Sequence, residues 1–290
     1  MARVLTASRS GILLSGVRAI APSNFAVPNG LVGYWGFDPD CIDITNKFAF
    51  DLIGGNTGTL STQAGGALPT AVGGQVGQAL SFTGITGGGG YVTMGNVLDA
   101  ITATISFSAA VWTNYTSQTT PNNYPGIFQK LNGTTGVGWG INVALSTSLN
   151  KPYWSLNDGT NNPTLFGPVF GDSFWHHICG ICDRTSNLMH LYTDGVWQGS
   201  TSISTLGSIS NTGALTIGVR ADTTNFSNCL NGFIDEVRLY NRPLSAHEVG
   251  DLYVAGLFGH RDSLIEISQT MMPVTFMPPP VFILMPQIVT

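Results

Sequence analysis

The sequence predicts an all-β protein with one short helix near its C-terminal end. Side chains in residues 233–240 alternate between two faces of a strand, one of which would carry Phe233, Asp235, Val237 and Leu239. Only 9% of the residues are charged, and 37 glycines together with many Ser, Thr and Asn residues are available for turns. This composition is typical of short strands joined by tight loops.

The predicted helix follows the 233–240 strand after a break at Asn241-Arg242-Pro243. Ser245 and Glu248 have the spacing of a capping box, in which each side chain accepts a hydrogen bond from the backbone N–H of the other residue. Gly256 is typical of a helix C-terminus. We therefore expect a single helix near residues 245–254.

A series of segments in this order resembles the laminin-G-like domain of the concanavalin A-like lectin/glucanase superfamily. The opening strand matches Leu31–Asp38, and the family's Asp-x-Ser-Gly-x-Asn-x-Gly turn matches Asp51–Gly58, with Ile53 in place of Ser. Later matches are Gly77–Phe82, Tyr91-Val92, Thr104–Phe107, Trp175–His177, Leu191–Gly195, Leu215–Gly218 and the strand and helix of 233–253.

The resemblance implies a two-sheet antiparallel jelly-roll sandwich over residues 31–256. Residues 1–30 and 257–290 lie outside the pattern and are expected to be extended N- and C-terminal arms. The pattern occurs once, so we expect one domain, which is large enough to bury most of its apolar surface without disulfides.

The charge of the chain argues against a nucleic-acid partner. The formal net charge is −5, and the 11 basic residues are scattered along the chain. No cluster of Lys and Arg is available to neutralise phosphates. No apolar stretch reaches the roughly 20 residues of a membrane-spanning helix, so we expect no membrane insertion.

The N-terminal segment imitates a secretion signal, because Arg3 and Arg9 precede an apolar run. Arg18 interrupts that pattern, and Pro22 follows the Ala19-Ile20-Ala21 stretch, where proline blocks cleavage. We therefore expect a structural arm.

The C-terminal arm is apolar and rich in proline and methionine. Proline at this density forbids a helix or a central strand, which leaves extended chain. An apolar segment of this kind is expected to lie on a surface, either its own sandwich or a neighbouring protein. We favour a neighbouring subunit or another structural protein, with contacts through Met271, Met272, Phe276, Met277, Phe282 and Ile283.

Glycoside hydrolysis is the first chemistry to weigh, since the superfamily includes glucanases. Retaining hydrolysis needs two carboxylates about 5–5.5 Å apart. The chain has no glutamate before Glu236, and adjacent residues such as Asp235 and Glu236 point to opposite faces of a strand. We therefore expect no enzymatic activity.

A structural calcium ion is implied by the resemblance, because members of the family often carry one. Asp38, Asp51, Asn56 and Asp235 could converge on the ion if the first and last strands are neighbours. Alternatively, Asp51 and Asn56 only cap the glycine turn through side-chain-to-backbone hydrogen bonds. Both interpretations are open at this stage.

The cysteine and histidine motifs point to structural roles. Cys179 and Cys182 are three residues apart on a predicted strand and so face opposite sides, which prevents joint metal ligation. Buried thiols are expected, while pairing of Cys41 with Cys229 stays open. Of the adjacent His176 and His177, one is expected to be buried and the other exposed.

Glycan binding needs exposed aromatic faces and polar side chains. The resemblance places Trp35, Trp112 and Trp175 in the core. The candidates for glycan contact are therefore Trp139, Tyr153, Trp154 and Trp197. The last of these follows a predicted hairpin turn at Asp194-Gly195.

These features favour a non-catalytic module displayed on the outside of a larger assembly, with a phage or virus particle as the specific hypothesis. The sandwich would adhere to glycans and the arms would anchor it as a decoration or fibre protein. A secreted or cell-surface bacterial lectin is the alternative, and a glycoside hydrolase is a more distant one.

Overall fold

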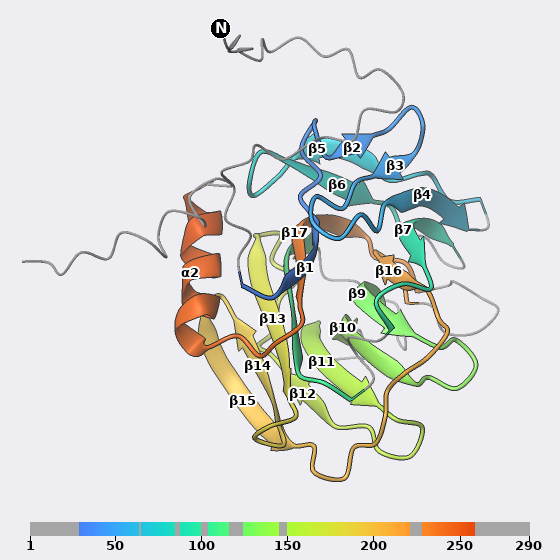
Figure 1. Ribbon diagram of the computed structural model, residues 1–290. Coiled ribbons are helices and arrows are strands. Elements are labelled where there is room, and N and C mark those ends of the chain that lie inside the picture. Colours follow the sequence, from blue (N-terminus) through green and yellow to red (C-terminus); the bar gives the residue numbers. More distant parts are fainter. Residues whose placement is uncertain are drawn as a thin grey trace, which may run out of the picture.

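The architecture is that of a two-layer sandwich in a computed structural model, which describes residues 29–63, 65–84, 88–99, 104–115, 124–144, 150–220 and 228–258. Figure 1 shows the two sheets packed face to face, with one helix on the outer side of one of them. All strand pairs are antiparallel, and the predicted jelly-roll sandwich with one short C-terminal helix is confirmed.

The first sheet, sheet A, has eight strands in the order β15-β14-β13-β8-β17-β6-β5, and β1 also pairs with β17. Its strands are β1 (Leu31–Trp35), β5 (Thr70–Gly73), β6 (Gln78–Phe82), β8 (Phe107–Tyr115), β13 (His176–Asp183), β14 (Leu188–Thr193), β15 (Val196–Ser202) and β17 (Gly232–Tyr240).

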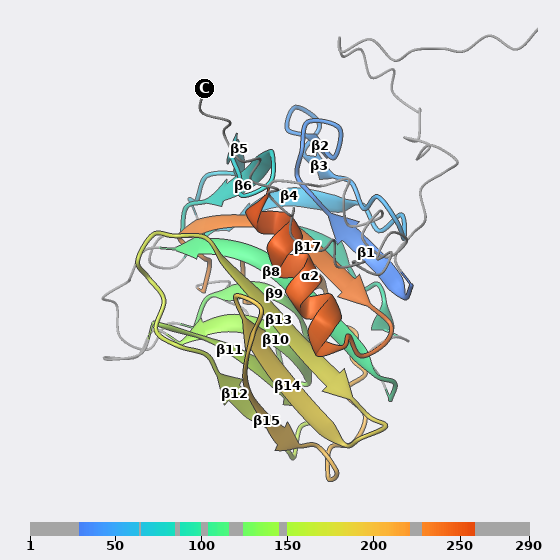
Figure 2. The same cartoon turned by 90° about the vertical axis from the view of Figure 1, so that its left-hand side faces the viewer.

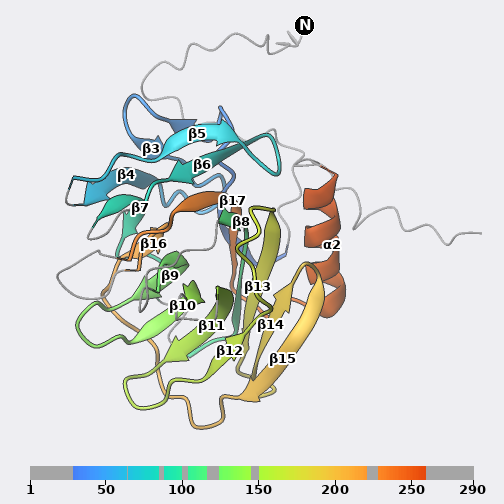
Figure 3. The same cartoon turned by 180° about the vertical axis from the view of Figure 1, so that it is seen from behind.

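The second sheet, sheet B, has nine strands in the order β12-β11-β10-β9-β16-β7-β4-β3-β2. Its strands are β2 (Ile42–Asp43), β3 (Phe48–Ala49), β4 (Gly58–Gln63), β7 (Gly89–Gly95), β9 (Gly126–Leu131), β10 (Gly138–Ala144), β11 (Lys151–Asn157), β12 (Thr164–Phe166) and β16 (Leu215–Ile217). Figure 3 presents this sheet from behind the view of Figure 1.

The main core lies between the sheets, where alternate residues of each strand point inward. Trp139 and Trp154 of sheet B pack there against Phe107 of sheet A, with ring centroids 5.4 and 5.8 Å from that of Phe107. Gly180 of β13 accommodates Trp154, because a Cβ at this position would lie 2.4 Å from the indole.

A smaller apolar cluster lies on the outer face of sheet A under helix α2 (Ala246–Leu257). Figure 2 shows the helix lying across this sheet. Val249 and Leu252 of the helix pack on Ala110, Cys179 and Ile181 of the strands. This face of the sandwich is therefore closed by the helix.

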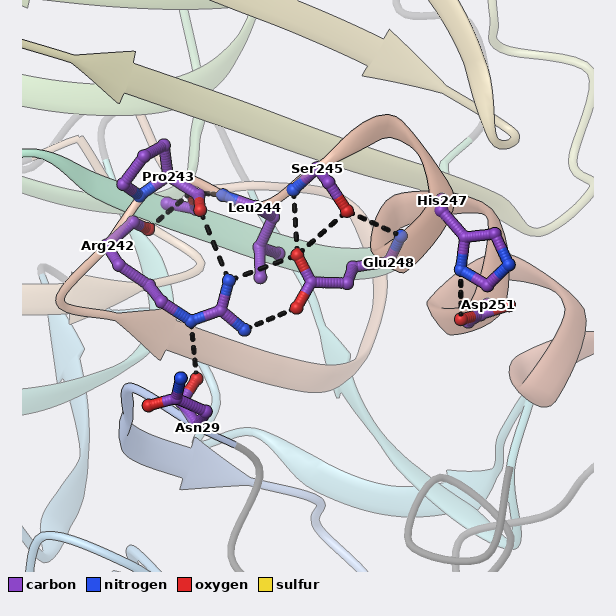
Figure 4. Close-up of polar contacts among 9 residues, drawn as sticks. Asn29, Arg242, Pro243, Leu244, Ser245, His247, Glu248 and Asp251 are labelled. Carbon is purple, nitrogen blue, oxygen red and sulfur yellow. Dashed lines mark hydrogen bonds and ion pairs between the residues drawn. The ribbon is translucent and has the colours of Figure 1, made fainter. Parts of the chain in front are cut away.

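The capping box predicted for the helix is confirmed. Ser245 is the N-cap and accepts from the Glu248 backbone N–H, while the Glu248 carboxylate accepts from the Ser245 backbone N–H at 2.8 Å. Figure 4 shows that Arg242 joins the same carboxylate to the Asn29 carbonyl. The helix start is thus tied through Arg242 to the residues that lead into β1.

The expected helix stop at Gly256 is wrong, since α2 continues to Leu257 and Phe258 is the C-cap. Gly256 is buried against Trp112, and a Cβ on it would lie 2.3 Å from the indole Nε1. Close packing, rather than helix termination, accounts for a glycine here.

The simple alternation predicted for 233–240 is also wrong in its second half. The β17–β8 register shifts between Asp235 and Arg238, and Glu236 has φ +55°. This bulge places Ile234 and Val237 on the same inner face, although they are three residues apart. Arg238 returns to the outer face of sheet A beside Tyr34, with its guanidinium carbon 4.5 Å from the ring centroid.

Within the described residues, no helix has the length and hydrophobicity needed to span a membrane.

Candidate functional site

A row of aromatic and uncharged polar side chains crosses the outer face of sheet B. It arises because Trp139, Ile141 and Val143 of β10 point into the core, which turns the residues between them outward. The register aligns two sets of neighbours on this face: Phe166, Tyr153 and Asn142 on β12, β11 and β10, and Gln129, Thr216 and Thr93 on β9, β16 and β7. Asn142 itself pairs with Gly126, so the two sets are offset by two residues along β10. We call these two sets together the sheet B row.

Gly140 lies in the middle of the sheet B row and joins its two halves. It pairs with Gln129 of the next strand. A Cβ on Gly140 would lie 2.7 Å from Asn142 Nδ2 and 3.1 Å from Gln129 Cβ. The two amide side chains are therefore close neighbours, with no side chain between them.

Two amide oxygens of the sheet B row lack a hydrogen-bond donor. Gln129 donates through Nε2 to the Val219 carbonyl at 2.7 Å, but its Oε1 is buried and accepts nothing from the described residues. Asn142 Oδ1 is also buried and accepts no hydrogen bond from the described residues, and both residues are at most 1% exposed. A buried polar atom without a partner costs about 1–3 kcal/mol, so both oxygens are suited to accept from an O–H or N–H group.

The β12 end of the sheet B row is aromatic. The Tyr153 ring has its centroid 5.7 Å from that of Phe166 and 6.2 Å from that of Tyr124. The Arg220 guanidinium carbon lies 5.6 Å from the Tyr124 ring centroid, and its Nη1 donates to the Tyr153 hydroxyl at 3.5 Å. Phe166 is 50% exposed, so part of this apolar residue is accessible from solvent.

Carboxylates are absent from this part of sheet B. The described strands β4, β7, β9, β10, β11, β12 and β16 contain neither Asp nor Glu. Uncharged amides, hydroxyls and aromatic rings can hydrogen-bond and stack, but they do not supply an acid and a nucleophile. Within these strands the sheet B row offers hydrogen bonding and stacking, and no pair of carboxylates.

The four residues predicted to bind glycans do not form one site. Trp139 and Trp154 are 0% exposed and belong to the core, because β10 and β11 turn them inward. Tyr153 lies in the sheet B row but is 8% exposed, and Trp197 is 56% exposed on β15 of the other sheet. Gln129 and Asn142 were missed, although alternation with apolar core neighbours would have placed them on an outer face.

The residues predicted to hold calcium do not converge on an ion either. Asp51 Oδ1 accepts from the backbone N–H groups of Tyr34, Ile53 and Gly54 at 2.9–3.1 Å. Its Oδ2 accepts from the backbone and side-chain nitrogens of Asn56 at 3.0 and 2.9 Å. These two residues therefore form a turn cap, which is the alternative that the sequence had left open.

The other two proposed calcium ligands accept hydrogen bonds from one loop of the chain. Asp38 Oδ1 accepts from Gln78 N, and Asp235 Oδ2 accepts from Val76 N, both at 2.9 Å. Burial, the nearby Glu236 and Asp38 raise the pKa of Asp235 well above its ordinary value. Within the described residues no three His, Cys, Asp or Glu side chains gather as a metal site, so the predicted set does not fit calcium.

Next to Asp235, Glu236 and Arg238 form a buried ion pair. Glu236 also accepts a hydrogen bond from the Tyr34 hydroxyl at 2.7 Å. Burial opposes the charge of Arg238, but Glu236, Tyr34 and Tyr240 together raise its pKa. This carboxylate therefore has a structural role at the bulge of β17.

The cysteines are structural, as predicted. Cys179 belongs to the outer cluster and Cys182 to the main core, so they face opposite sides of β13. Cys41 and Cys229, like these two, lie in the described residues as buried thiols without a disulfide. Burial raises the pKa of Cys182 and Cys229 to about 12.

The adjacent histidines differ as expected, but one has partners that the sequence did not reveal. His177 is 1% exposed, and burial with the nearby Arg238 lowers its pKa to about 3. His176 is partly exposed and contacts both Asp172 and Asp194. Only the folded chain brings Asp194 to this position.

The residues predicted for the assembly arm, Met271, Met272, Phe276, Met277, Phe282 and Ile283, lie outside the described residues, as does almost all of the predicted 1–30 arm.

Several solved structures that are similar to this chain are binding domains of toxins. The binding domain of Paraclostridial mosquitocidal protein 1 has a TM-score of 0.55 at 18% identity, covering 77% of this chain and 52% of that one. The binding domain of botulinum neurotoxin serotype G has a TM-score of 0.57 at 15% identity, and the match covers 77% of this chain and 50% of that one. The chain thus spans about half the length of these toxin domains, and the likeness concerns the fold.

Domain 4 of AbnA, a GH43 extracellular arabinanase from Geobacillus stearothermophilus, is similar over nearly its whole length. Its structure, determined in complex with arabinotriose, has a TM-score of 0.54 at 17% identity and covers 77% of this chain and 98% of that one. No curated protein matches the sequence.

A family model for laminin-G-like domains, described as "Concanavalin A-like lectin/glucanases superfamily", matches residues 86–250, more than half of the chain. The matched range contains most of both sheets and the start of α2. The chain therefore belongs to the concanavalin A-like lectin/glucanases superfamily.

Proposed function

We propose that the chain is a non-catalytic module that binds a glycan on the outer face of sheet B. The observation that carries this proposal is the sheet B row, in which two buried amide oxygens without donors adjoin an aromatic end. Sugars present hydroxyl donors next to apolar C–H faces, and this pairing matches the two parts of the row.

The orientation of a bound sugar follows from the row. Gln129 Oε1 and Asn142 Oδ1 stay without donors among the described residues, but both side chains are at most 1% exposed, so a sugar hydroxyl would reach them through a bridging water. The C–H surface of the sugar would lie toward Phe166, the exposed ring at the β12 end. The arabinotriose complex of the similar arabinanase domain supports a sugar ligand on this fold.

A glycoside hydrolase is the weaker alternative. The strands that carry the sheet B row supply no carboxylate pair, and Glu236 and Glu248 are held in ion pairs with Arg238 and Arg242. A surface without an acid and a nucleophile can retain a glycan without cleaving it. We therefore expect no release of reducing sugar from β-glucans.

We also propose that the module is displayed outside a larger assembly, such as a phage or virus particle, through its terminal arms. The support is the composition of residues 257–290, which is apolar yet too rich in proline for a folded element of its own. A secreted bacterial lectin is the alternative for the same binding module.

Glycan binding is tested on a glycan array, followed by titration calorimetry with the sugars retained. Phe166→Ala should weaken binding about tenfold, which corresponds to roughly 1.4 kcal/mol of lost stacking. Phe258→Ala is the matched control, since Phe258 is 71% exposed but follows α2 on the other sheet, away from the sheet B row. Equal loss in both variants, or an array without any retained sugar, would contradict the proposal.

Display through the arms is tested by light scattering of the full-length chain beside a chain that ends at Phe258, where α2 is capped. A defined oligomer that becomes a folded monomer after truncation supports assembly through residues 259–290. Stable monomers in both cases would favour the secreted lectin.

A further inference from the structure

The imidazole of His176 lies between two carboxylates at the start of β13. Nδ1 is 2.8 Å from Asp194 Oδ2, in the turn between β14 and β15. Nε2 is 3.1 Å from Asp172 Oδ1, in the loop of residues 167–175 between β12 and β13. The ring therefore connects this loop to a turn of the neighbouring hairpin.

The two carboxylates are anchored to different degrees. Asp194 Oδ1 also accepts from the His177 backbone N–H at 2.9 Å, and the Asp194 N–H donates to the His177 carbonyl at 2.8 Å. Asp172 is 48% exposed, and within the described residues its carboxylate otherwise accepts from Phe174 N at 3.0 Å. Asp194 is thus fixed by β13, whereas His176 is the long-range partner of the Asp172 side chain; the backbone of the loop is held separately, since Asn114 Nδ2 donates to the Ser173 carbonyl at 2.8 Å.

The surroundings of the ring contain few other charges. Phe170 stacks on it, with ring centroids 3.7 Å apart and planes 8° apart. Tyr253 of α2 and Tyr115 of β8 are the titratable groups near Asp194 and Asp172, and each carboxylate contributes to raising the pKa of the tyrosine close to it. The adjacent His177 is buried, with a pKa lowered to about 3, and adds no charge near neutral pH.

Both carboxylates can be hydrogen-bonded only when both ring nitrogens carry protons. A neutral imidazole keeps one N–H, and Nδ1–H is the one retained because Asp194 is fixed in place. Nε2 then presents a lone pair to the Asp172 carboxylate, and that contact becomes repulsive. The proton is lost to solvent, since the His176 side chain is 17% exposed.

We propose that Asp172, His176 and Asp194 form a pH-operated latch that holds the 167–175 loop against the β14–β15 turn while His176 is protonated and releases Asp172 when Nε2 loses its proton. The loop carries the exposed Val169 and Phe174, and Phe166 of the sheet B row immediately precedes it. Gly167 N and Phe170 N donate to the Pro152 and Asn150 carbonyls, both at 2.8 Å, so the latch acts on the part of the loop after Phe170, which carries Phe174.

The pH range of the latch follows from its two titrating partners. Burial lowers the pKa of His176, but the hydrogen bonds and charges of Asp194 and Asp172 outweigh burial and raise it above 6.5. Burial opposes ionisation of Asp172, but hydrogen bonds from Phe174 and His176 lower its pKa below 3.8. Between pH 3.8 and pH 6.5, the ordinary pKa values of Asp172 and His176, the carboxylate is ionised and the imidazole is protonated, so the His176–Asp172 hydrogen bond is fully formed. This hydrogen bond is lost as the pH rises through the raised pKa of His176.

The experiment is hydrogen–deuterium exchange of the 167–175 loop in the full-length chain at pH 5.5 and 8.5, corrected for intrinsic exchange. Protection should fall about two- to fivefold at the higher pH, the factor typical of a partly exposed ion pair. Two-bond ¹H–¹⁵N spectra should show His176 changing from the doubly protonated ring to the Nδ1–H tautomer over the same range.

Two variants decide the assignment. His176→Gln has no proton to lose, and Asp172→Asn can donate to a neutral Nε2, so each should remove the pH response of the loop. His247→Gln is the matched control, because His247 forms a similar pair with Asp251, at 2.9 Å, on the exposed side of α2. The proposal is overturned if protection in the unmodified chain is the same at both pH values, or if Asp172→Asn retains the response.

Discussion

The outer faces of the two sheets differ, although both sheets share one core. The outer face of sheet A is closed by α2 over an apolar cluster, with the Glu236–Arg238 ion pair buried beside it. The outer face of sheet B carries the uncharged sheet B row, and no helix of the described residues covers it. Among the described residues each sheet buries polar atoms without a partner: Trp112 Nε1, His177 Nδ1 and Asp235 Oδ1 in sheet A, and Gln129 Oε1, Asn142 Oδ1 and Trp139 Nε1 in sheet B. In sheet B two of them are amide oxygens on the outer face. The comparison separates a face built for stability from one suited to binding.

The largest expected effect is on the sheet A face. Arg238→Met leaves the buried Glu236 carboxylate without its counter-charge and should lower the free energy of unfolding by about 3–5 kcal/mol, measured by urea denaturation. Arg242→Met is the control, because Arg242 pairs with a partly exposed Glu248 and its loss should cost clearly less. Similar losses in the two variants would show that burial of the pair does not matter.

A second prediction concerns the pH dependence of the same face. The pKa of Asp235 is raised in the folded chain, so the folded state binds its proton more tightly and stability falls as pH rises from 3.8 through the raised value. Asp235→Asn should remove this fall and stabilise the protein at pH 8 by more than about 1.4 kcal/mol, the equivalent of one pKa unit. Urea denaturation at pH 5, 7 and 9 is the measurement. A slope unchanged by the substitution would refute the raised pKa.

The sheet B face should respond in the opposite way to loss of a polar group. Asn142→Leu removes a buried oxygen without a donor and should raise the free energy of unfolding by about 1 kcal/mol, while weakening glycan binding. Thermal unfolding and the titration used for Phe166→Ala measure the two effects. A loss of stability would mean that this oxygen has a partner in solution.

The smallest expected effect is that of metal removal. Because both oxygens of Asp51 already accept hydrogen bonds from its own turn and from Tyr34 of β1, EDTA and added calcium should both leave the melting temperature within about 1 °C. A shift of several degrees with calcium would show that Asp38, Asp51, Asn56 or other groups rearrange around an ion.

Local patterns in the sequence were sufficient for many elements. The capping box of Ser245 and Glu248 and the opposite faces of Cys179 and Cys182 follow from helix and strand periodicity alone. The turn at Asp194-Gly195 has positive φ at both residues, as a two-residue hairpin requires. These features depend on residues within a few positions of each other.

The errors share a different origin. Trp139 and Trp154 were expected at the surface because tryptophan serves both in cores and in glycan sites, and only the packing of two sheets turns them inward. The bulge at Glu236 shifts the alternation of β17, which the residue types did not reveal. Gly256 was mistaken for a helix stop because its contact, Trp112, is far away in the sequence.

The sequence by itself determined the fold class, the order of strands that resemble the family, the single capped helix and the absence of glutamate before Glu236. The tertiary structure alone decided which polar residues meet across strands, including Gln129 with Asn142 and His176 with Asp194. The reason is physical: periodicity and capping act within one turn or strand, whereas a site is formed by side chains from separate strands, whose proximity depends on register and sheet packing.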